Sequence, residues 1–215
     1  MTFAFLRIGL MRIYLVRHGE SEANAGLSDA IDCGLTERGI RQSKAVATVL
    51  AGFGVSHVLS SPYRRSLETA ETIRSVTAAK AEFWPAVHEH HHDPFPAGVW
   101  PLPRRSELES QWPNFVAPSD MPQTHWAAVP EDRARQWQRI GAAVHWLLDR
   151  FRLDRDAGVA VVTHQAPGSV FVQAFCQWSN PLNVRVHIDP GSITVLEVDS
   201  QERRHLVRLN WLPPI

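Results

Sequence analysis

The most informative feature of this chain is an apolar run that ends abruptly in polar residues. Residues 13–16 (Ile-Tyr-Leu-Val) are typical of a buried strand, and Arg17, His18 and Gly19 follow directly. Open α/β folds place their ligands at the carboxyl ends of such strands. Arginine offers a planar fork for phosphate or carboxylate, and histidine can act as a nucleophile near neutral pH. We expect Gly19 to permit a sharp turn that a β-carbon would oppose.

Two later segments repeat this arrangement of an apolar run followed by polar residues. Residues 57–60 lead into a polar stretch that contains Arg64 and Arg65, and residues 159–162 lead into Thr163 and His164. Each segment alone is compatible with an ordinary solvated strand end. Their order along the chain predicts that the polar ends meet at one edge of a sheet.

These segments together resemble the histidine phosphatase superfamily, the phosphoglycerate-mutase-like group. The family pattern is Arg-His-Gly on the first strand, Ser-x-x-x-Arg at the second helix, and a late strand ending in a second histidine; here these are residues 17–19, 60–64 and 161–164. Residues 35–39 (Leu-Thr-Glu-Arg-Gly) are similar to the family's Leu-Thr-x-x-Gly helix start, with Gln42 behind it. The resemblance runs from Met11 to about residue 178 and is weak from 90 to 130.

The bulk properties exclude several classes of protein. Its 215 residues suit one domain with a substantial core, and 22 cationic residues balance 22 acidic ones. We therefore expect neither nucleic acid nor a membrane as partner. We expect a cytoplasmic protein, which could also form a homo-oligomer. Cys33 and Cys176 imply no disulfide framework. Met11 is a second candidate start, with residues 1–10 an N-terminal extension and 11–215 a single domain.

Strand and helix patterns alternate, which predicts a three-layer α/β sandwich with a mainly parallel central sheet and helices on both faces. Thr36 is the expected cap of one helix, and Ser61 with Pro62 the expected start of the next. Residues 131–152 show the clearest helical spacing, and residues 170–178 indicate a further helix. Residues 192–198 and 205–211 are expected to be two closing strands.

Between residues 93 and 130 the apolar residues show no sustained helical or strand periodicity, so the alternation of strands and helices is interrupted there. It contains more than half of the fifteen prolines and three of the eight tryptophans. Tryptophans need packing partners, so the composition favours an ordered excursion over a linker. The resemblance implies a cap of about residues 90–130 that covers the active site and shapes substrate choice; a purely structural cap is the alternative.

The convergence of Arg17, His18, Arg64 and His164 would create a site for a dianion. Neighbouring arginines would lower the pKa of His18 and keep its imidazole neutral and nucleophilic. The resemblance implies that His18 becomes phosphorylated, that His164 stabilises the transferring group, and that Asn24 presents its amide to the phosphate. We interpret Arg65 as a helix-surface cation, the role that Arg64 would otherwise have.

A leaving alkoxide needs a proton, so the reaction requires a carboxylic acid. The family's acid follows the third strand in a Leu-x-Glu context, and Val87-His88-Glu89 is the nearest match. We expect Glu89 to protonate the leaving group and then to deprotonate the attacking water. Three competing carboxylates remain open: Asp93, Glu107 and Glu109.

The run from His88 to Asp93 (His-Glu-His-His-His-Asp) invites a rival interpretation as a metal site. However, the His-x-His-x-Asp-His spacing of metallo-β-lactamase-like hydrolases is not reproduced, because Asp93 comes one place late. We therefore expect no metal and no other cofactor, and a polar loop at the rim of an anion site.

The leading hypothesis is a phosphomonoester hydrolase that acts through phosphohistidine on a small phosphorylated metabolite. Between Glu89 and Trp126 the sequence lacks the Tyr-Gly and Asn-Lys elements with which mutases of this family bind phosphoglycerate, so a mutase is the first alternative. An inactive module that binds phosphorylated ligands is the second. Competent residues at every candidate catalytic position argue against an inactive module.

Overall fold

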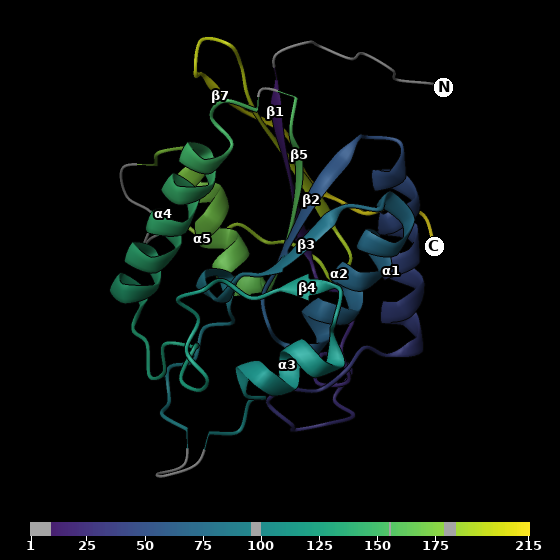
Figure 1. Ribbon diagram of the computed structural model, residues 1–215, viewed down its shortest axis with the longest axis vertical. Coiled ribbons are helices and arrows are strands. Elements are labelled where there is room, and N and C mark those ends of the chain that lie inside the picture. Colours follow the sequence, from purple (N-terminus) through teal and green to yellow (C-terminus); the bar gives the residue numbers. More distant parts are fainter. Residues whose placement is uncertain (1–9, 96–99, 155, 179–183) are drawn as a thin grey trace.

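A seven-stranded sheet forms the centre of the molecule, and helices cover both of its faces (Figure 1). The computed structural model describes residues 10–95, 100–154, 156–178 and 184–215. The strand order is β4-β3-β2-β5-β1-β6-β7. The strands are β1 (Met11–Arg17), β2 (Val55–Ser60), β3 (Lys80–Phe83), β4 (Phe115–Val116), β5 (Gly158–Thr163), β6 (Ile193–Val198) and β7 (Arg204–Trp211). The first five strands in this order pair in parallel, whereas β6 and β7 are antiparallel additions, so the predicted mainly parallel sheet is confirmed.

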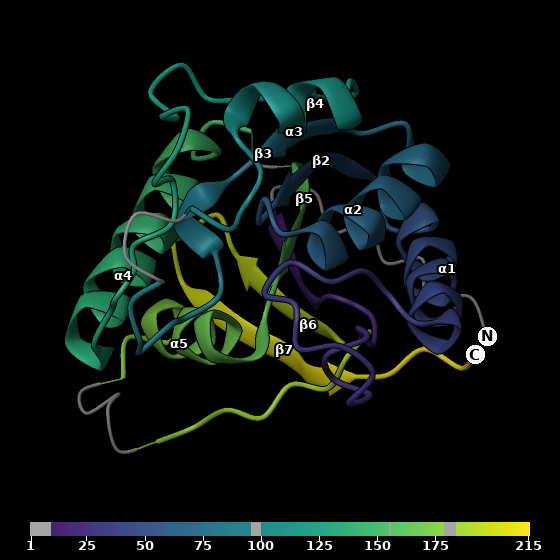
Figure 2. The same cartoon turned by 90° about the horizontal axis from the view of Figure 1, so that it is seen from below.

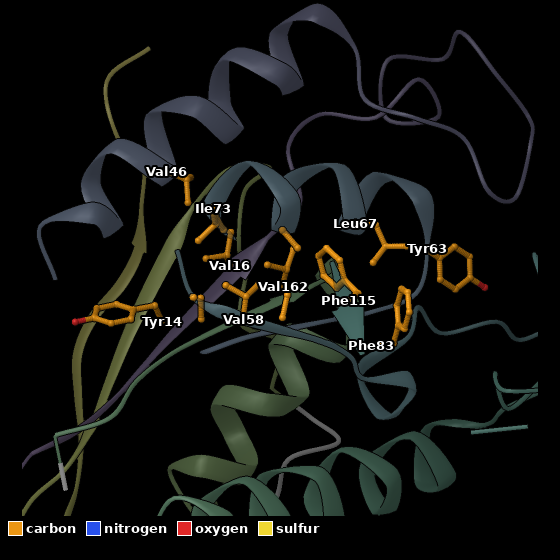
Figure 3. Close-up of a cluster of buried hydrophobic side chains, with 14 of the residues drawn as sticks. Tyr14, Val16, Val46, Val58, Tyr63, Leu67, Ile73, Phe83, Phe115 and Val162 are labelled. Atoms are coloured by element: carbon orange, nitrogen blue, oxygen red, sulfur yellow. The ribbon is translucent and has the colours of Figure 1, made fainter. Parts of the chain in front are cut away.

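The helices form the outer layers of the predicted three-layer sandwich, which the structure confirms. Helices α1 (Glu37–Ala51) and α2 (Arg64–Thr77) pack on one face, and α4 (Arg133–Arg150) and α5 (Gln165–Phe175) pack on the other (Figures 1 and 2). Figure 3 shows the first interface, where Val46 and Ile73 meet Val16 of the sheet. On the other face, Ile140 and Phe171 belong to the cluster that covers Leu15. Burial of a side chain of this size contributes roughly 1.5–3 kcal/mol.

The alternation of strand residues between the two faces explains why the central strands are apolar throughout. In β5 all six residues are buried: Val162 belongs to the cluster under α1 and α2, and Val161 to the cluster under α4 and α5. A strand covered on both faces needs apolar residues at every position. The polar residues Arg17 of β1 and Thr163 of β5 lie at the carboxyl ends of these strands, where the apolar covering stops.

The segment with many prolines is ordered in its described part, as the tryptophans indicated. It contains the short helix α3 (Arg105–Gln111) and the strand β4, which pairs in parallel with β3; a 3-10 turn, η1 (Pro85–Val87), precedes it. We did not predict α3, η1 or β4 because each is too short to show a period. In Figure 1, α3 lies in the lower half of the molecule and β4 lies just above it.

Two further observations bear on the expectations that we drew from the composition, on membrane segments and on the cysteines. Among the described residues, no helix combines the length and apolar character that crossing a membrane requires. Cys33 is buried and Cys176 is partly buried, and both are free thiols.

Candidate active site

The candidate site lies where β1, β2 and β5 end together. In the parallel register Arg17 lies opposite Thr163, and Ser60 lies opposite Val162, so the residues that follow each strand emerge side by side. His18 N donates to Thr163 O at 3.0 Å, and Ser61 N donates to Val162 O at 3.0 Å. These two bonds extend the sheet by one residue and fix the backbone of the site.

Gly19 is needed for close packing rather than for the sharp turn that we expected. A β-carbon at Gly19 would overlap the carbonyl group of Gly39 at the start of α1, and Gly39 would in turn overlap the backbone of Glu20. Thr36 caps α1 as predicted, since its Oγ1 accepts from Gly39 N at 3.1 Å. The two glycines therefore let α1 approach the loop that carries His18.

The ring of His18 is held in one tautomer. Its Nδ1 lies 2.7 Å from the carbonyl oxygen of Gly19, and since a carbonyl only accepts, Nδ1 carries the proton. The Nε2 atom therefore keeps its lone pair. His18 is 2 % exposed, and its pKa is lowered well below 6.5, first by burial and then by the charge of Arg65. The imidazole is neutral, as expected, but burial rather than the arginines is the main cause.

The second histidine faces the first across the site. The ring centroids of His18 and His164 are 5.0 Å apart, and His164 is fully buried. Its Nε2 is 2.8 Å from Ser61 Oγ and 3.4 Å from Ser66 Oγ, while its buried Nδ1 has no hydrogen-bond partner among the described residues. If the two hydroxyls donate to Nε2, Nδ1 carries the proton and is available as a donor. Burial, then Arg65, lowers the pKa of His164, so this ring is also neutral.

Ser61 does not cap α2, contrary to our expectation. The helix begins at Arg64, its N-cap residue Tyr63 makes no side-chain capping bond, and Ser61 Oγ is used by His164. The carboxylate of Asp32 caps the helix from a distant loop, because its Oδ1 accepts from Arg64 N at 2.7 Å. A hydroxyl that looks like a local cap thus orients a site histidine instead.

Arg17 points along the end of the sheet toward the start of α5. Its Nη1 donates to Ile188 O at 2.8 Å and to Gln165 Oε1 at 3.3 Å, but its buried Nε has no partner among the described residues. Two buried nitrogen atoms at the ends of adjacent strands, Arg17 Nε and His164 Nδ1, therefore lack a partner among the described residues. An unpaired buried donor costs about 1–3 kcal/mol, so such groups are expected to meet an acceptor.

The arginine that turns toward the site is Arg65, not Arg64, and this corrects our prediction. The Arg64 side chain is 60 % exposed and pairs with Glu68 at 2.8 Å, whereas Arg65 is 7 % exposed and donates to Ile31 O at 3.0 Å. The charge of Arg65 acts on the pKa of His18 and of His164. The physical reason is helical geometry: Arg65 lies on the buried face of α2, one turn before the buried Thr69, while Arg64 lies on the solvent-facing side, one turn before Glu68. Read from Ser61 instead of Ser60, the Ser-x-x-x-Arg pattern ends at Arg65.

Glu89 lies beside the histidines. Its Oε2 is 3.8 Å from His164 Nδ1, which is an ion-pair distance rather than a hydrogen bond, and its Oε1 accepts from His90 N at 2.9 Å. Burial raises the pKa of Glu89, and this effect exceeds the opposing effect of Arg65. A carboxyl with a raised pKa is suited to donate a proton near neutral pH.

The competing carboxylates have other partners or surroundings. Glu107 Oε2 accepts from Arg104 N at the start of α3, Glu109 pairs with Arg105 at 2.9 Å, and Asp93 is exposed. Asn24 is also exposed, and its Oδ1 accepts from Ser21 N at 3.2 Å. The described contacts join Asn24 to its own loop rather than to the two histidines, so its phosphate-binding role stays a prediction.

The histidines that follow β3 make their contacts within the protein, next to the segment of residues 93–130, which we call the insertion. His88 Nδ1 lies 2.6 Å from Glu89 O, and His88 Nε2 accepts from Ala128 N at 2.9 Å, so both ring nitrogens are used. His91 Nε2 is 2.7 Å from Tyr63 OH, and His90 Nδ1 is 3.2 Å from Glu131. Within the described ranges, no three histidine, cysteine or carboxylate side chains converge in a way that could hold a metal ion.

The geometry agrees with a comparison to known proteins. Residues 13–212 match the family model of the histidine phosphatase superfamily (branch 1). The chain belongs to the histidine phosphatase superfamily. Its curated relatives include proteins named probable phosphoglycerate mutase GpmB. The protein from Yersinia pestis (strain Pestoides F) is 30 % identical over 145 residues, 65 % of this chain and 62 % of that protein. The protein from Photorhabdus laumondii is 36 % identical over 84 residues, 38 % and 39 % of the two chains. The matches thus span less than two thirds of these relatives.

Solved structures share the fold of this chain over nearly its full length. A mycobacterial glucosyl-3-phosphoglycerate phosphatase has a TM-score of 0.67 at 22 % identity, covering 94 % of this chain and 99 % of that chain. A phosphoserine phosphatase from Entamoeba histolytica has a TM-score of 0.63 at 20 % identity, covering 93 % and 96 %. At these identities the likeness concerns the fold.

One wall of the candidate site was not foreseen from the sequence. Tyr63 is fully buried, its ring meets that of His164 edge-on at 5.2 Å, and the guanidinium carbon of Arg65 lies 4.7 Å from its ring centroid. From the insertion, Trp126 and His91 pack on the same ring at 5.7 and 5.9 Å. A tyrosine directly before the helix gave no signal in the sequence beyond its apolar character.

Proposed function

We propose that this protein is a phosphomonoester hydrolase that acts through a phosphohistidine on His18. The observation that carries the proposal is a pair of buried nitrogen atoms without partners among the described residues, Arg17 Nε and His164 Nδ1, beside a histidine whose Nε2 keeps its lone pair. A phosphoryl group is an acceptor of matching charge, and its transfer requires mainly positioning and charge neutralisation.

The first half of the reaction follows from the placement of the side chains. The lone pair of His18 Nε2 forms the N–P bond while the ester P–O bond breaks, and Glu89 gives its proton to the leaving oxygen. Arg17, Arg65 and His164 offset the charge on the phosphoryl oxygens. The raised pKa of Glu89 and the neutral state of His18 fit these roles, because the first must hold a proton and the second must lack one.

The second half returns the site to its starting state. Water attacks phosphorus, its proton passes to Glu89, the N–P bond breaks, and inorganic phosphate leaves. A phosphoglycerate-type mutase is the second candidate, favoured by the names of the curated relatives. In a mutase the phosphoryl group passes to a second hydroxyl rather than to water.

The experiment that tests the proposal measures the fate of the phosphoryl group. Wild-type protein and His18→Ala are incubated with p-nitrophenyl phosphate, with and without glycerate as acceptor. We expect wild type to release inorganic phosphate in equal amount to p-nitrophenol, and His18→Ala to lose several orders of magnitude in turnover. Transfer to glycerate in preference to water would support the mutase, and absence of turnover would contradict both reactions.

A further inference from the structure

A pocket of about 370 Å³ lies beside the candidate active site, between α4 and α5. The first turn of α4 and one side of α5 form two of its walls, and residues 184–187 and His90 with His92 form the others. Figures 1 and 2 show the two helices next to each other on the same face of the sheet. The volume is at the lower end of the range for small-molecule sites, which suits a small metabolite rather than a large one. We call it the α4–α5 pocket.

Two residues connect this pocket to the active site. Gln165 lines the pocket, accepts from Arg17 Nη1 at 3.3 Å and donates to Val186 O at 3.0 Å, so the pocket wall is bonded to a phosphate-site arginine. His90 also lines the pocket, and its backbone N–H donates to Glu89 Oε1 at 2.9 Å. The pocket thus begins next to the proposed phosphate ligand and next to the proposed acid. The leaving group must pass the acid, because the acid protonates its oxygen.

The chemistry of the pocket walls favours an anion. Its described lining contains two exposed arginines, Arg133 and Arg185, and three histidines, His90, His92 and His187, but no carboxylate residue. The nearby carboxylate of Glu131 is 1 % exposed and accepts from Nε and Nη2 of Arg139, so its charge is already compensated. His187 also lies 3.1 Å from Asp189, so the positive charge of the lining comes mainly from Arg133 and Arg185. Of these two, Arg185 directly precedes Val186, whose carbonyl oxygen accepts from Gln165.

A buried donor inside the pocket points to a ligand independently of charge. Gln136 is 4 % exposed and lines the pocket, yet its buried Nε2 has no hydrogen-bond partner among the described residues. An amide N–H₂ buried without an acceptor costs about 1–3 kcal/mol unless a ligand or water supplies one. An acceptor group bound between Gln136 and Arg185 would satisfy both.

We propose that the α4–α5 pocket binds the leaving group of the substrate, and that this leaving group carries a second anionic group held by Arg185 and Gln136. The substrate class is therefore a small phosphomonoester with a carboxylate or second phosphate at the far end from the ester. This inference rests on the proposed phosphatase function. It adds a specificity determinant outside the residues that contact the transferred phosphoryl group.

The test uses two matched series of substrates. In one series, ω-carboxyalkyl phosphates have two to six methylenes; in the other, ω-hydroxyalkyl phosphates of the same lengths lack the second charge. We expect kcat/KM to be at least about tenfold higher for the carboxylate at the best length, since a hydrogen bond to a charged group contributes about 1.5–3 kcal/mol. The ratio of the two series is the readout, because both share the same reacting phosphate.

Substitutions in the pocket then locate the second anion. Arg185→Gln, an exposed change that leaves packing intact, should bring the ratio close to one, and Gln136→Leu should lower it in part. Arg41→Gln on the exposed side of α1 is the matched control and should keep the wild-type ratio. A wild-type ratio of one at every length, with p-nitrophenyl phosphate still hydrolysed, would overturn the pocket assignment alone. A ratio that Arg185→Gln retains would overturn it too, and absence of turnover on all substrates would overturn both proposals.

Discussion

Arg64 and Arg65 are adjacent on α2, yet their guanidinium groups lie in opposite surroundings. Arg64 pairs with Glu68 in solvent, while Arg65 is buried beside Tyr63 and influences both site histidines. Solvent screens an exposed ion pair, whereas a buried charge next to a phosphate acts strongly.

The pair of arginines gives a matched test of charge neutralisation. We expect Arg65→Gln to lower kcat/KM for p-nitrophenyl phosphate by about 10²–10³, the range found when one donor to a developing charge is removed. Arg64→Gln should change it less than about threefold. Steady-state kinetics of both variants check this, with circular dichroism to show that each is folded. A larger loss in Arg64→Gln than in Arg65→Gln would restore our original prediction.

Glu89 should act as acid in the first step and as base in the second. A p-nitrophenolate leaving group needs little protonation, whereas a glycerol alkoxide needs much. Glu89→Gln should therefore slow the cleavage of glycerol phosphate far more than the formation of phosphoenzyme from p-nitrophenyl phosphate. With the aryl substrate, rapid-quench kinetics should show a burst followed by slow turnover.

Asp93→Asn serves as the control for Glu89→Gln, because Asp93 is exposed and follows the same strand. Asp93→Asn should turn over both substrates at the wild-type rate. Equal and small effects of Glu89→Gln on the two substrates would exclude Glu89, and Asp93, Glu107 and Glu109 would then be examined in that order.

Buried neutral histidines should make the fold sensitive to acid. Burial, reinforced by the charge of Arg139, lowers the pKa of His88 to about 3, so the unfolded chain binds the proton first as pH falls below about 6.5. The stability that neutral His88 contributes is present above that pH and is lost between about 6.5 and 3. From pH 7 to pH 5 this group alone should cost about 2 kcal/mol of the free energy of unfolding.

A substitution isolates this contribution. His88→Gln keeps an acceptor for Ala128 N and cannot titrate, so its loss of stability from pH 7 to pH 5 should be smaller by about 2 kcal/mol. Urea unfolding at the two pH values measures this difference. His145→Gln, on the exposed side of α4, should show the wild-type pH dependence. The same acid dependence in His88→Gln as in wild type would contradict the assignment.

The reaction should not require a metal ion. Cationic and neutral donors lie around the proposed phosphoryl position, and His88, His90 and His91 already have hydrogen-bond partners within the protein. Turnover of p-nitrophenyl phosphate should be unchanged after dialysis against EDTA. Loss of activity that zinc or manganese restores would favour the histidine run from His88 to Asp93 as a metal site.

The sequence predicted the elements that show a regular hydrophobic pattern. It missed the features that depend on contacts between residues far apart in the chain. Buried strands such as residues 13–16 show themselves by continuous apolar character, and His18 and His164 follow from their places at strand ends. The choice between Arg64 and Arg65 depends on where α2 begins, and Asp32 from a remote loop helps to set that start. The role of Ser61 likewise depends on His164, 103 residues away.

The insertion shows the same limit. Its tryptophans predicted order, but the contact of Trp126 with Tyr63 is made across the fold and leaves no local pattern. Gly19 was predicted to matter for its backbone freedom, whereas the approach of Gly39 from α1 is the actual constraint. Such pairs become visible only when two distant elements are placed side by side.

The central claim is that His18 carries the phosphoryl group. Rapid quenching in alkali, followed by mass-spectrometric mapping of phosphopeptides, tests it most directly. Protein mixed with excess p-nitrophenyl phosphate is denatured in alkali, digested and analysed for phosphopeptides. We predict one phosphoryl group on the peptide that contains His18, stable in alkali, lost in acid, and absent from His18→Ala. Phosphate on another residue, or an undiminished yield and turnover in His18→Ala, would contradict the account.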